Sequence, residues 1–475
     1  MANYKELIGL SARQAVKALE KKQLKPIELL DAAIQRTEEV DKEINALPLR
    51  LFEQARAAAK NFKPSKKAKS GSLAGLPFVA KEYNDIKGQP TTFGSPLFKE
   101  HRATETAITV SVLENAGGIV MAKSNVPEFA GSNTFNSVYG ATRNPHDLRM
   151  TVGGSSGGAA ASLASGMAWL AMGSDVGGSL RIPASYCGIV GLRPTPGRVA
   201  RARSLLPFDP IWVEGPMART VDDLALMLDV QSAYVQEDPL SRPPPEVSFS
   251  EQIKAPLKGA KVGYSSNLGL SEVDAEVVDV TRRAAAKLGE ANARVVEKGP
   301  DLSGAIETFQ IQRAHLFASY YGELVKKERD KIPASIVWNV QKGLDLTADE
   351  TLRAERERKR LVQVMRAYFE EYDFLVCPTV SVPPFAVEQA YPTEINGRQM
   401  ATYIDWMAMT FIITVTGNPA ISVPCGFNKR GLPIGLQIVA RHNAEGELLA
   451  LAAQLESILN LKTAEPIDPR KVAAA

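Results

Sequence analysis

Apolar residues recur every three or four positions over the first sixty residues of the chain, and this spacing predicts amphipathic helices. Ser11 is a suitable cap for one of them, because a serine hydroxyl accepts a hydrogen bond from a free amide of the first helical turn. Pro26 suits the first turn of the next helix, and a third helix is expected over residues 52–62. Residues 1–65 are therefore expected to form a helical segment whose apolar stripes pack on the core of the protein.

From about residue 75 onwards, short apolar runs that end in polar or Gly-rich sequence alternate with helical patterns. We expect strands at 77–81, 118–123, 169–173, 261–264, 294–296, 374–377, 420–424 and 434–440, and helices at 104–116, 157–165, 272–289, 348–372 and 445–459. This alternation favours a mostly parallel, buried sheet with helices on both faces. Residues 66–465 are expected to form one α/β domain, with a loose, proline-rich excursion at 236–258 and a tail at 466–475.

Composition and charge exclude several classes of function. The chain has 475 residues, 45% of them hydrophobic, which is ample for a large buried core. Its 56 Lys and Arg against 53 Asp and Glu leave a net charge of +3, so we expect no binding to nucleic acid. The lysines within 63–69 are interrupted by Pro and Ser and indicate a solvated loop. The sequence contains no basic cluster of the kind that would predict a strongly anionic substrate.

The apolar runs and the cysteines indicate a cytoplasmic protein. No apolar run approaches the roughly 20 residues that span a bilayer, so no membrane association is expected, and the first residues lack the apolar core of a signal peptide. The cysteines are odd in number, far apart and not in a metal-binding spacing, which favours neither disulfides nor a metal site: Cys187, Cys377 and Cys425.

Ten glycines fall between residues 153 and 191, mostly in two Gly-Ser motifs at 153–158 and 173–181. Such motifs can cradle a phosphate, make tight turns, or expose backbone amides around a serine nucleophile. The lysine that would complete a phosphate-binding P-loop is absent. Residues 153–157 also match the Gly-x-Ser-x-Gly elbow with Ser155 as nucleophile, but the polar sequence before them is expected to be a loop and not the strand that an elbow needs.

A serine nucleophile needs a base. None of the four histidines lies in the Gly-Ser stretch: His101, His146, His315 and His442. Lys81 ends the apolar run 75–81, and burial there would lower its pKa and make it a usable base. Lys123 has a similar setting, and either lysine could instead end its strand in solvent, so the spacing alone does not choose between them.

Taken together, these pieces resemble the amidase signature family. The likeness rests on Lys81 in a Gly-x-Pro-x-x-x-Lys context, on the motifs at 153–158 and 173–181, and on the continuing run 187–195. It extends over about residues 70–460. The resemblance implies an α/β/α sandwich with a large mixed, mostly parallel central sheet covered by helices, plus the N-terminal helices.

The resemblance also implies a role for each motif residue. Lys81 is similar to the base of that family, Ser155 to a bridging serine in a cis peptide bond, and Ser179 to the nucleophile. The expected oxyanion hole consists of the N–H groups of Val176, Gly177, Gly178 and Ser179. The residues expected to orient the loop are Ser156, Asp175 and Arg181. No metal or cofactor is expected, and homodimers are common in the family.

The implied reaction is hydrolysis of the carbon–nitrogen bond of a small-molecule carboxamide or acyl hydrazide through a Ser179 acyl-enzyme. The general pattern resembles the bacterial aryl amidase and hydrazidase branch, so an apolar or aryl acyl group is expected. Aromatic residues of the variable regions are the candidates for the substrate pocket: Phe129, Tyr139, Trp212, Tyr320, Trp338 and Trp406. Two alternatives stay open, namely the glutaminase subunit of a tRNA-dependent amidotransferase and a non-catalytic ligand-binding relative.

Overall fold

The computed structural model describes residues 3–63, 71–201, 204–255, 257 and 259–470, and its centre is an 11-stranded sheet within this part of the chain. The order across the sheet is β1-β3-β2-β8-β10-β9-β16-β17-β13-β11-β12. The strands are β1 (Leu49–Arg50), β2 (Pro77–Lys81), β3 (Ile119–Ser124), β8 (Leu170–Asp175), β9 (Val190–Arg193), β10 (Val213–Ala218), β11 (Lys261–Tyr264), β12 (Arg294–Glu297), β13 (Phe374–Pro378), β16 (Ala420–Phe427) and β17 (Pro433–Val439). Three two-stranded ladders lie outside it: β4 (Phe135–Asn136) with β5 (Gly140–Ala141), β6 (Arg143–Asn144) with β7 (Asp147–Thr151), and β14 (Glu394–Ile395) with β15 (Arg398–Gln399).

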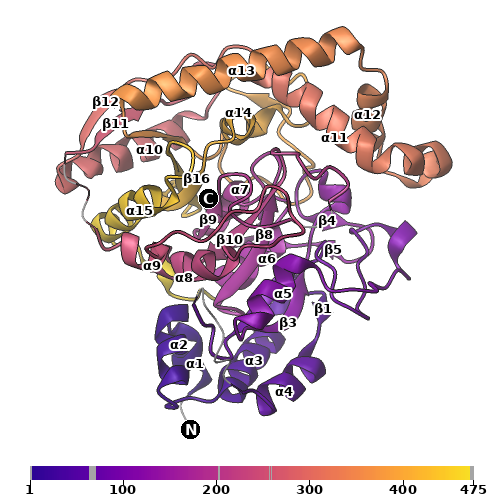
Figure 1. The fold of residues 1–475 in the computed structure, drawn as a ribbon, viewed down its shortest axis with the longest axis vertical. Helices are drawn as coiled ribbons and strands as arrows, with labels where there is room; N and C mark the ends of the chain where they lie inside the picture. Colours follow the sequence, from indigo (N-terminus) through magenta and orange to yellow (C-terminus); the bar gives the residue numbers. More distant parts are fainter. Residues whose placement is uncertain (1–2, 64–70, 202–203, 256, 258, 471–475) are drawn as a thin grey trace.

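Helices cover this sheet and extend beyond both of its ends (Figure 1). They are α1 (Tyr4–Gly9), α2 (Ala12–Glu20), α3 (Pro26–Ile44), α4 (Phe52–Lys60), α5 (Ile108–Asn115), α6 (Gly157–Ala164), α7 (Arg181–Cys187), α8 (Val221–Gln231), α9 (Phe249–Gln252), α10 (Ala275–Lys287), α11 (Ala305–Glu328), α12 (Ala334–Leu344), α13 (Ala348–Glu371), α14 (Ala408–Thr416) and α15 (Glu445–Leu459). Figure 1 places α1–α4 at one end of the molecule and α11–α13 at the opposite end. No helix in the described part of the chain combines the length and the apolar character needed to cross a membrane.

The large mixed sheet covered by helices is confirmed, but the expectation that parallel pairs dominate is wrong. Parallel pairing is confined to β3-β2-β8 near one edge and β13-β11-β12 at the other. The remaining neighbours in the described sheet run antiparallel. The difference arises because β9 and β10 were not predicted, and because β16 and β17 are joined through residues 428–432 alone, a connection too short to return a strand to the parallel direction.

The N-terminal helices form as their sequence predicts. Ser11 caps α2 through a capping box with Gln14, and Pro26 is the first residue of α3. Arg36 of α3 is buried and donates hydrogen bonds to the carbonyls of Ser165 (2.7 Å) and Ile467 (2.9 Å), which ties these helices to the sheet domain. The expected boundary at 65/66 and the end of the tail at 471–475 lie outside the described residues. The described residues of the excursion at 236–258 are irregular apart from α9.

Candidate active site

Two parallel strands bring the predicted lysine and the second Gly-Ser motif to one edge of the sheet. Lys81 is the last residue of β2 and Asp175 is the last residue of β8, its parallel neighbour. The Lys81 Nζ donates hydrogen bonds to the hydroxyls of Ser155 (2.7 Å), Ser174 (2.9 Å) and Ser156 (3.0 Å). The structure therefore joins Lys81 directly to both serines of the first motif.

The Lys81 ammonium has lost all contact with solvent, and burial lowers its pKa to about 7. The negative charges of Glu214 and Asp175 oppose this shift in part. Glu214 lies on β10 opposite Ser174 of β8, and burial raises the pKa of its carboxyl. A lysine held this way can accept a proton near neutral pH, which an ordinary solvent-exposed lysine rarely does.

Ser155 lies in the turn between β7 and α6, and its peptide bond to Gly154 is cis. A Cβ atom added to Gly154 would lie 2.1 Å from the carbonyl oxygen of Ser132, so only glycine fits this close approach. The polar sequence before the motif, which was expected to be a loop, contains the short strand β7. This strand belongs to a separate two-stranded ladder and not to the central sheet.

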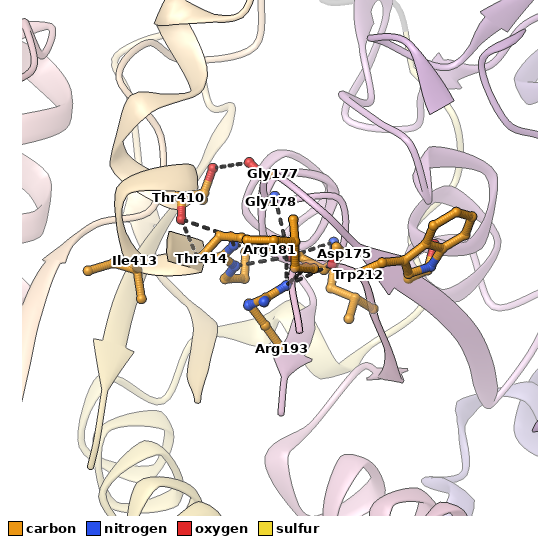
Figure 2. A network of polar contacts seen from close by, with 12 residues as sticks. Asp175, Gly177, Gly178, Arg181, Arg193, Trp212, Thr410, Ile413 and Thr414 are labelled. Carbon is orange, nitrogen blue, oxygen red and sulfur yellow. Dashed lines mark hydrogen bonds and ion pairs between the residues drawn. The ribbon is translucent and has the colours of Figure 1, made fainter. Parts of the chain in front are cut away.

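Asp175 is the centre of a buried ionic network (Figure 2). Its carboxylate accepts hydrogen bonds from Arg181 Nη2 (2.9 Å) and Nε (3.0 Å) and from Arg193 Nη1 (3.2 Å). Burial alone would raise the pKa of Asp175, but the two guanidinium groups outweigh it and lower that pKa to about 2. Arg181 also donates to the Thr410 carbonyl and the Thr414 hydroxyl of α14, so the network fixes the start of α7 against α14. Sequence reasoning named two members of this network and missed Arg193.

The same carboxylate shapes the loop between β8 and α7. Its oxygens accept from the N–H groups of Gly178 (2.9 Å) and Leu180 (3.2 Å). Gly178 was predicted as an oxyanion-hole donor, and in this structure its N–H donates to Asp175. In the described part of the chain, no acceptor is bound by the N–H groups of the other three predicted donors: Val176, Gly177 and Ser179.

A cavity opens beside these amides, and both Ser155 and Ser179 lie in its wall. The rest of the wall is largely aromatic and apolar, and it consists of Phe129, Ala130, Gly131, Ser132, Gly154, Ser174, Val176, Gly177, Trp212, Arg313, Leu316, Phe317, Tyr320, Tyr321 and Met407. Ser179 is partly exposed in this wall, and its hydroxyl has no hydrogen-bond partner among the described residues.

Of the aromatic residues predicted for the pocket, Phe129, Trp212 and Tyr320 line this cavity. The other three do not. Trp406 is buried in a separate cluster, where it packs against Tyr186 and Phe385. The remaining two lie outside the wall: Trp338 is 41% exposed, and Tyr139 lies in the connection between β4 and β5.

Sequence reasoning named Tyr320 of α11 but missed the other residues that this helix contributes to the wall, among them the aromatic Phe317 and Tyr321. No periodic signal marks these residues as pocket-facing, because α11 buries side chains over much of its circumference.

The rival bases lie elsewhere. Lys123 Nζ donates to the Pro90 carbonyl (2.6 Å) and the Thr91 hydroxyl (2.8 Å), away from the serines. None of the four histidines lines the cavity, and burial lowers the pKa of His146 to about 4 beside the Cys187 carbonyl. Within the described residues, no group of three or more His, Cys, Asp or Glu side chains is arranged to hold a metal ion.

Comparison with known proteins finds matches that extend over almost the whole chain. The family model described as Amidase matches residues 28–449. The chain is 36% identical over 471 residues to the Acylamidase of Rhodococcus erythropolis, with 98% of each chain covered. It is 32% identical to a Glutamyl-tRNA(Gln) amidotransferase subunit of Halothermothrix orenii, covering 97% of this chain and 99% of that protein. The crystal structure of a bacterial aryl acylamidase of the amidase signature family superposes with a TM-score of 0.89 at 28% identity, covering 96% of this chain and 97% of that one.

Proposed function

Because this chain belongs to the amidase family, whose enzymes hydrolyse amide carbon–nitrogen bonds, we propose that it cleaves small carboxamides and acyl hydrazides with an apolar or aryl acyl group. The proposed intermediate is an ester between Ser179 Oγ and the acyl group. The observation that carries the proposal is the 2.7 Å hydrogen bond between a fully buried Lys81 and Ser155, at the wall of a cavity that also contains Ser179.

In the proposed mechanism, neutral Lys81 takes the Ser155 proton while Ser155 takes the proton of Ser179. The Ser179 oxygen attacks the carbonyl carbon, and the negative charge that forms on the carbonyl oxygen is stabilised by the free amides of the 176–179 loop. The relay then protonates the leaving nitrogen as the C–N bond breaks. Water, deprotonated by the same relay, cleaves the ester and restores Ser179. A hydrazide differs only in the nitrogen substituent of its leaving group, so the same steps apply.

The aromatic wall of the cavity favours apolar and aryl acyl groups, because flat side chains stack on such groups and exclude water. Glutamine suits the cavity less well. Its α-ammonium group needs an acidic partner, and no Asp or Glu lines the cavity among the described residues. A stand-alone amidohydrolase is therefore favoured over a glutaminase subunit.

The test is product release, followed by mass spectrometry, from a mixed panel of aryl amides, aliphatic amides, an aryl hydrazide, glutamine and an ester. Each substrate is incubated with the wild-type protein and with Ser179→Ala. We expect turnover of the aryl amide or hydrazide that disappears in Ser179→Ala while the fold is retained. Substantial activity of Ser179→Ala would refute the nucleophile, and turnover of glutamine alone would favour the amidotransferase subunit. Homodimerisation remains a prediction, which light scattering on the purified protein would test.

A further inference from the structure

One charged side chain, Arg313 of α11, lines the cavity that contains Ser155 and Ser179, and no other charged residue of the described chain does so. Arg313 is 4% exposed. Its Nη1 atom is buried without a hydrogen-bond partner, and no ion pair or hydrogen bond in the described structure involves its guanidinium group. A buried cation with empty donors at the wall of a ligand cavity needs a partner, because water no longer solvates it.

The other buried arginines show how unusual this is. Every one of them within the described residues donates at least one hydrogen bond to a carbonyl or carboxylate: Arg36, Arg181, Arg193, Arg198 and Arg219. Arg193 and Arg198 each leave their Nε unpaired, but other donors of the same guanidinium groups are bound, so these five arginines have structural partners. Arg313 has the burial of that group without its partners, which points to a ligand.

The surroundings of Arg313 support its side chain without neutralising it. Its guanidinium carbon lies 4.3 Å from the centroid of the Phe317 ring and 5.3 Å from that of the Tyr403 ring. These rings contact the guanidinium group without accepting hydrogen bonds from its N–H groups. Asp405, two residues after Tyr403, is bound instead by Thr402 and Gln310.

From this geometry we propose that the substrate is an anionic amide, in which an apolar or aryl group joins the scissile carboxamide to a carboxylate bound by Arg313. A guanidinium offers a planar pair of donors that matches a carboxylate, and the aromatic wall surrounds the spacer. The absence of a basic cluster in the sequence led to the opposite expectation. One buried arginine is enough to bind a carboxylate, because no acidic side chain of the described wall compensates its charge. This inference rests on the proposed function and narrows its substrate class.

The experiment compares substrates of nearly equal shape and different charge. One pair is 4-carbamoylbenzoate and 4-nitrobenzamide, and a flexible pair is adipamate and heptanamide. The wild-type protein should prefer the carboxylate member of at least one pair by about 10- to 100-fold in kcat/KM, the range expected for hydrogen bonds to a charged group. The nitro group activates its amide electronically, so it biases the comparison against the proposal. A wild-type ratio of one or less in both pairs would overturn the inference.

Variants separate substrate binding from support of the fold. Arg313→Gln should abolish the preference for the carboxylate member, mainly through KM, and Arg313→Lys should restore part of it. If Arg313 had a purely structural role, the substitution would lower kcat/KM for both members of a pair together and leave their ratio unchanged. That result would also overturn the proposal. If circular dichroism shows that Arg313→Gln does not fold, the wild-type kcat/KM ratio and the Arg313→Lys variant still test the proposal.

A binding measurement keeps the test independent of turnover. In Ser179→Ala protein, calorimetric titration should show 4-carbamoylbenzoate or adipamate binding at least about tenfold more weakly once Arg313→Gln is added. Equal affinities would refute the role of Arg313. Absence of Ser179-dependent turnover of every substrate would instead refute the proposed function, so the two failures are distinguishable.

Discussion

The pH dependence of turnover tests the role of Lys81 most directly. Burial lowers the pKa of Lys81 to about 7, and the mechanism uses the neutral amine. With that pKa, about half of the molecules carry neutral Lys81 at pH 7 and about one in ten at pH 6, whereas an ordinary lysine would be neutral in roughly one molecule in 2,500 at pH 7. We therefore expect kcat/KM to rise about tenfold per pH unit below pH 6 and to level off above about pH 8.

A charge change next to Lys81 makes this prediction sharper. The Glu214 carboxylate favours the protonated form of Lys81 and so raises its pKa. Glu214→Gln removes that charge at nearly constant shape, and the acid limb of the profile should move to lower pH. Glu465→Gln, at an exposed carboxylate, is the matched control for the loss of one negative charge, and its profile should match the wild type.

The assay is steady-state kcat/KM between pH 5 and 9 at constant ionic strength, with a carboxamide that has no ionising group in this range. Circular dichroism at each pH checks that the fold is intact. A midpoint above pH 9 would mean that Lys81 behaves as an ordinary lysine, and a midpoint below pH 5 would assign the limb to a carboxyl group. Either result, or a Glu214→Gln limb that moves to higher pH, would refute the electrostatic reasoning.

Three further substitutions test the surroundings of the site. Asp175→Asn leaves two buried guanidinium groups without their counter-ion, so the free energy of unfolding in urea should fall by about 3–5 kcal/mol. Gly178→Ala places a methyl group 2.2 Å from a threonine hydroxyl at a backbone φ of +124°, and kcat/KM should fall at least about 100-fold; Gly289→Ala, with no atom within 4 Å of the added carbon, should retain activity. Trp212→Ala should raise KM for an aryl amide about 3- to 10-fold, while Trp338→Ala should leave it unchanged, because only the first residue lines the cavity.

The local elements of this fold could be predicted from the sequence because their signals are local. The strand at 77–81 and the helix at 445–459 are found as predicted, since an apolar run and a helical stripe need no knowledge of the rest of the chain. The order and direction of the strands could not be predicted in this way. Strand β10, with a proline at its centre, lies antiparallel between β8 and β9, and this pairing depends on residues far apart in the sequence.

For the candidate site, too, the sequence supplied local signals but not the contacts between distant residues. The spacing of the residues did not choose between Lys81 and its weaker rival Lys123 as the base, and only the resemblance to a family selected Lys81. The structure separates them by their partners, which are serine hydroxyls for Lys81 and the Pro90 carbonyl and Thr91 hydroxyl for Lys123. The hydrogen bond from the Gly178 N–H to Asp175 was also beyond the sequence, because a glycine's N–H can serve a ligand or a neighbouring carboxylate equally well.

The proposed catalytic residues and much of the cavity wall come from different parts of the chain. This explains why the sequence motifs predict the catalytic residues and not the wall. Residues 77–187 supply the lysine, the serines and the amide loop from adjacent strands and turns. Much of the opposite wall comes from α11, more than a hundred residues later, whose side chains can change without disturbing that geometry. Relatives named as an acylamidase and as part of an amidotransferase can therefore match almost the full chain at similar identity. It follows that the search for the natural substrate has to begin from the wall of α11, and from the unpaired charge of Arg313 in particular, and not from the Gly-Ser motifs.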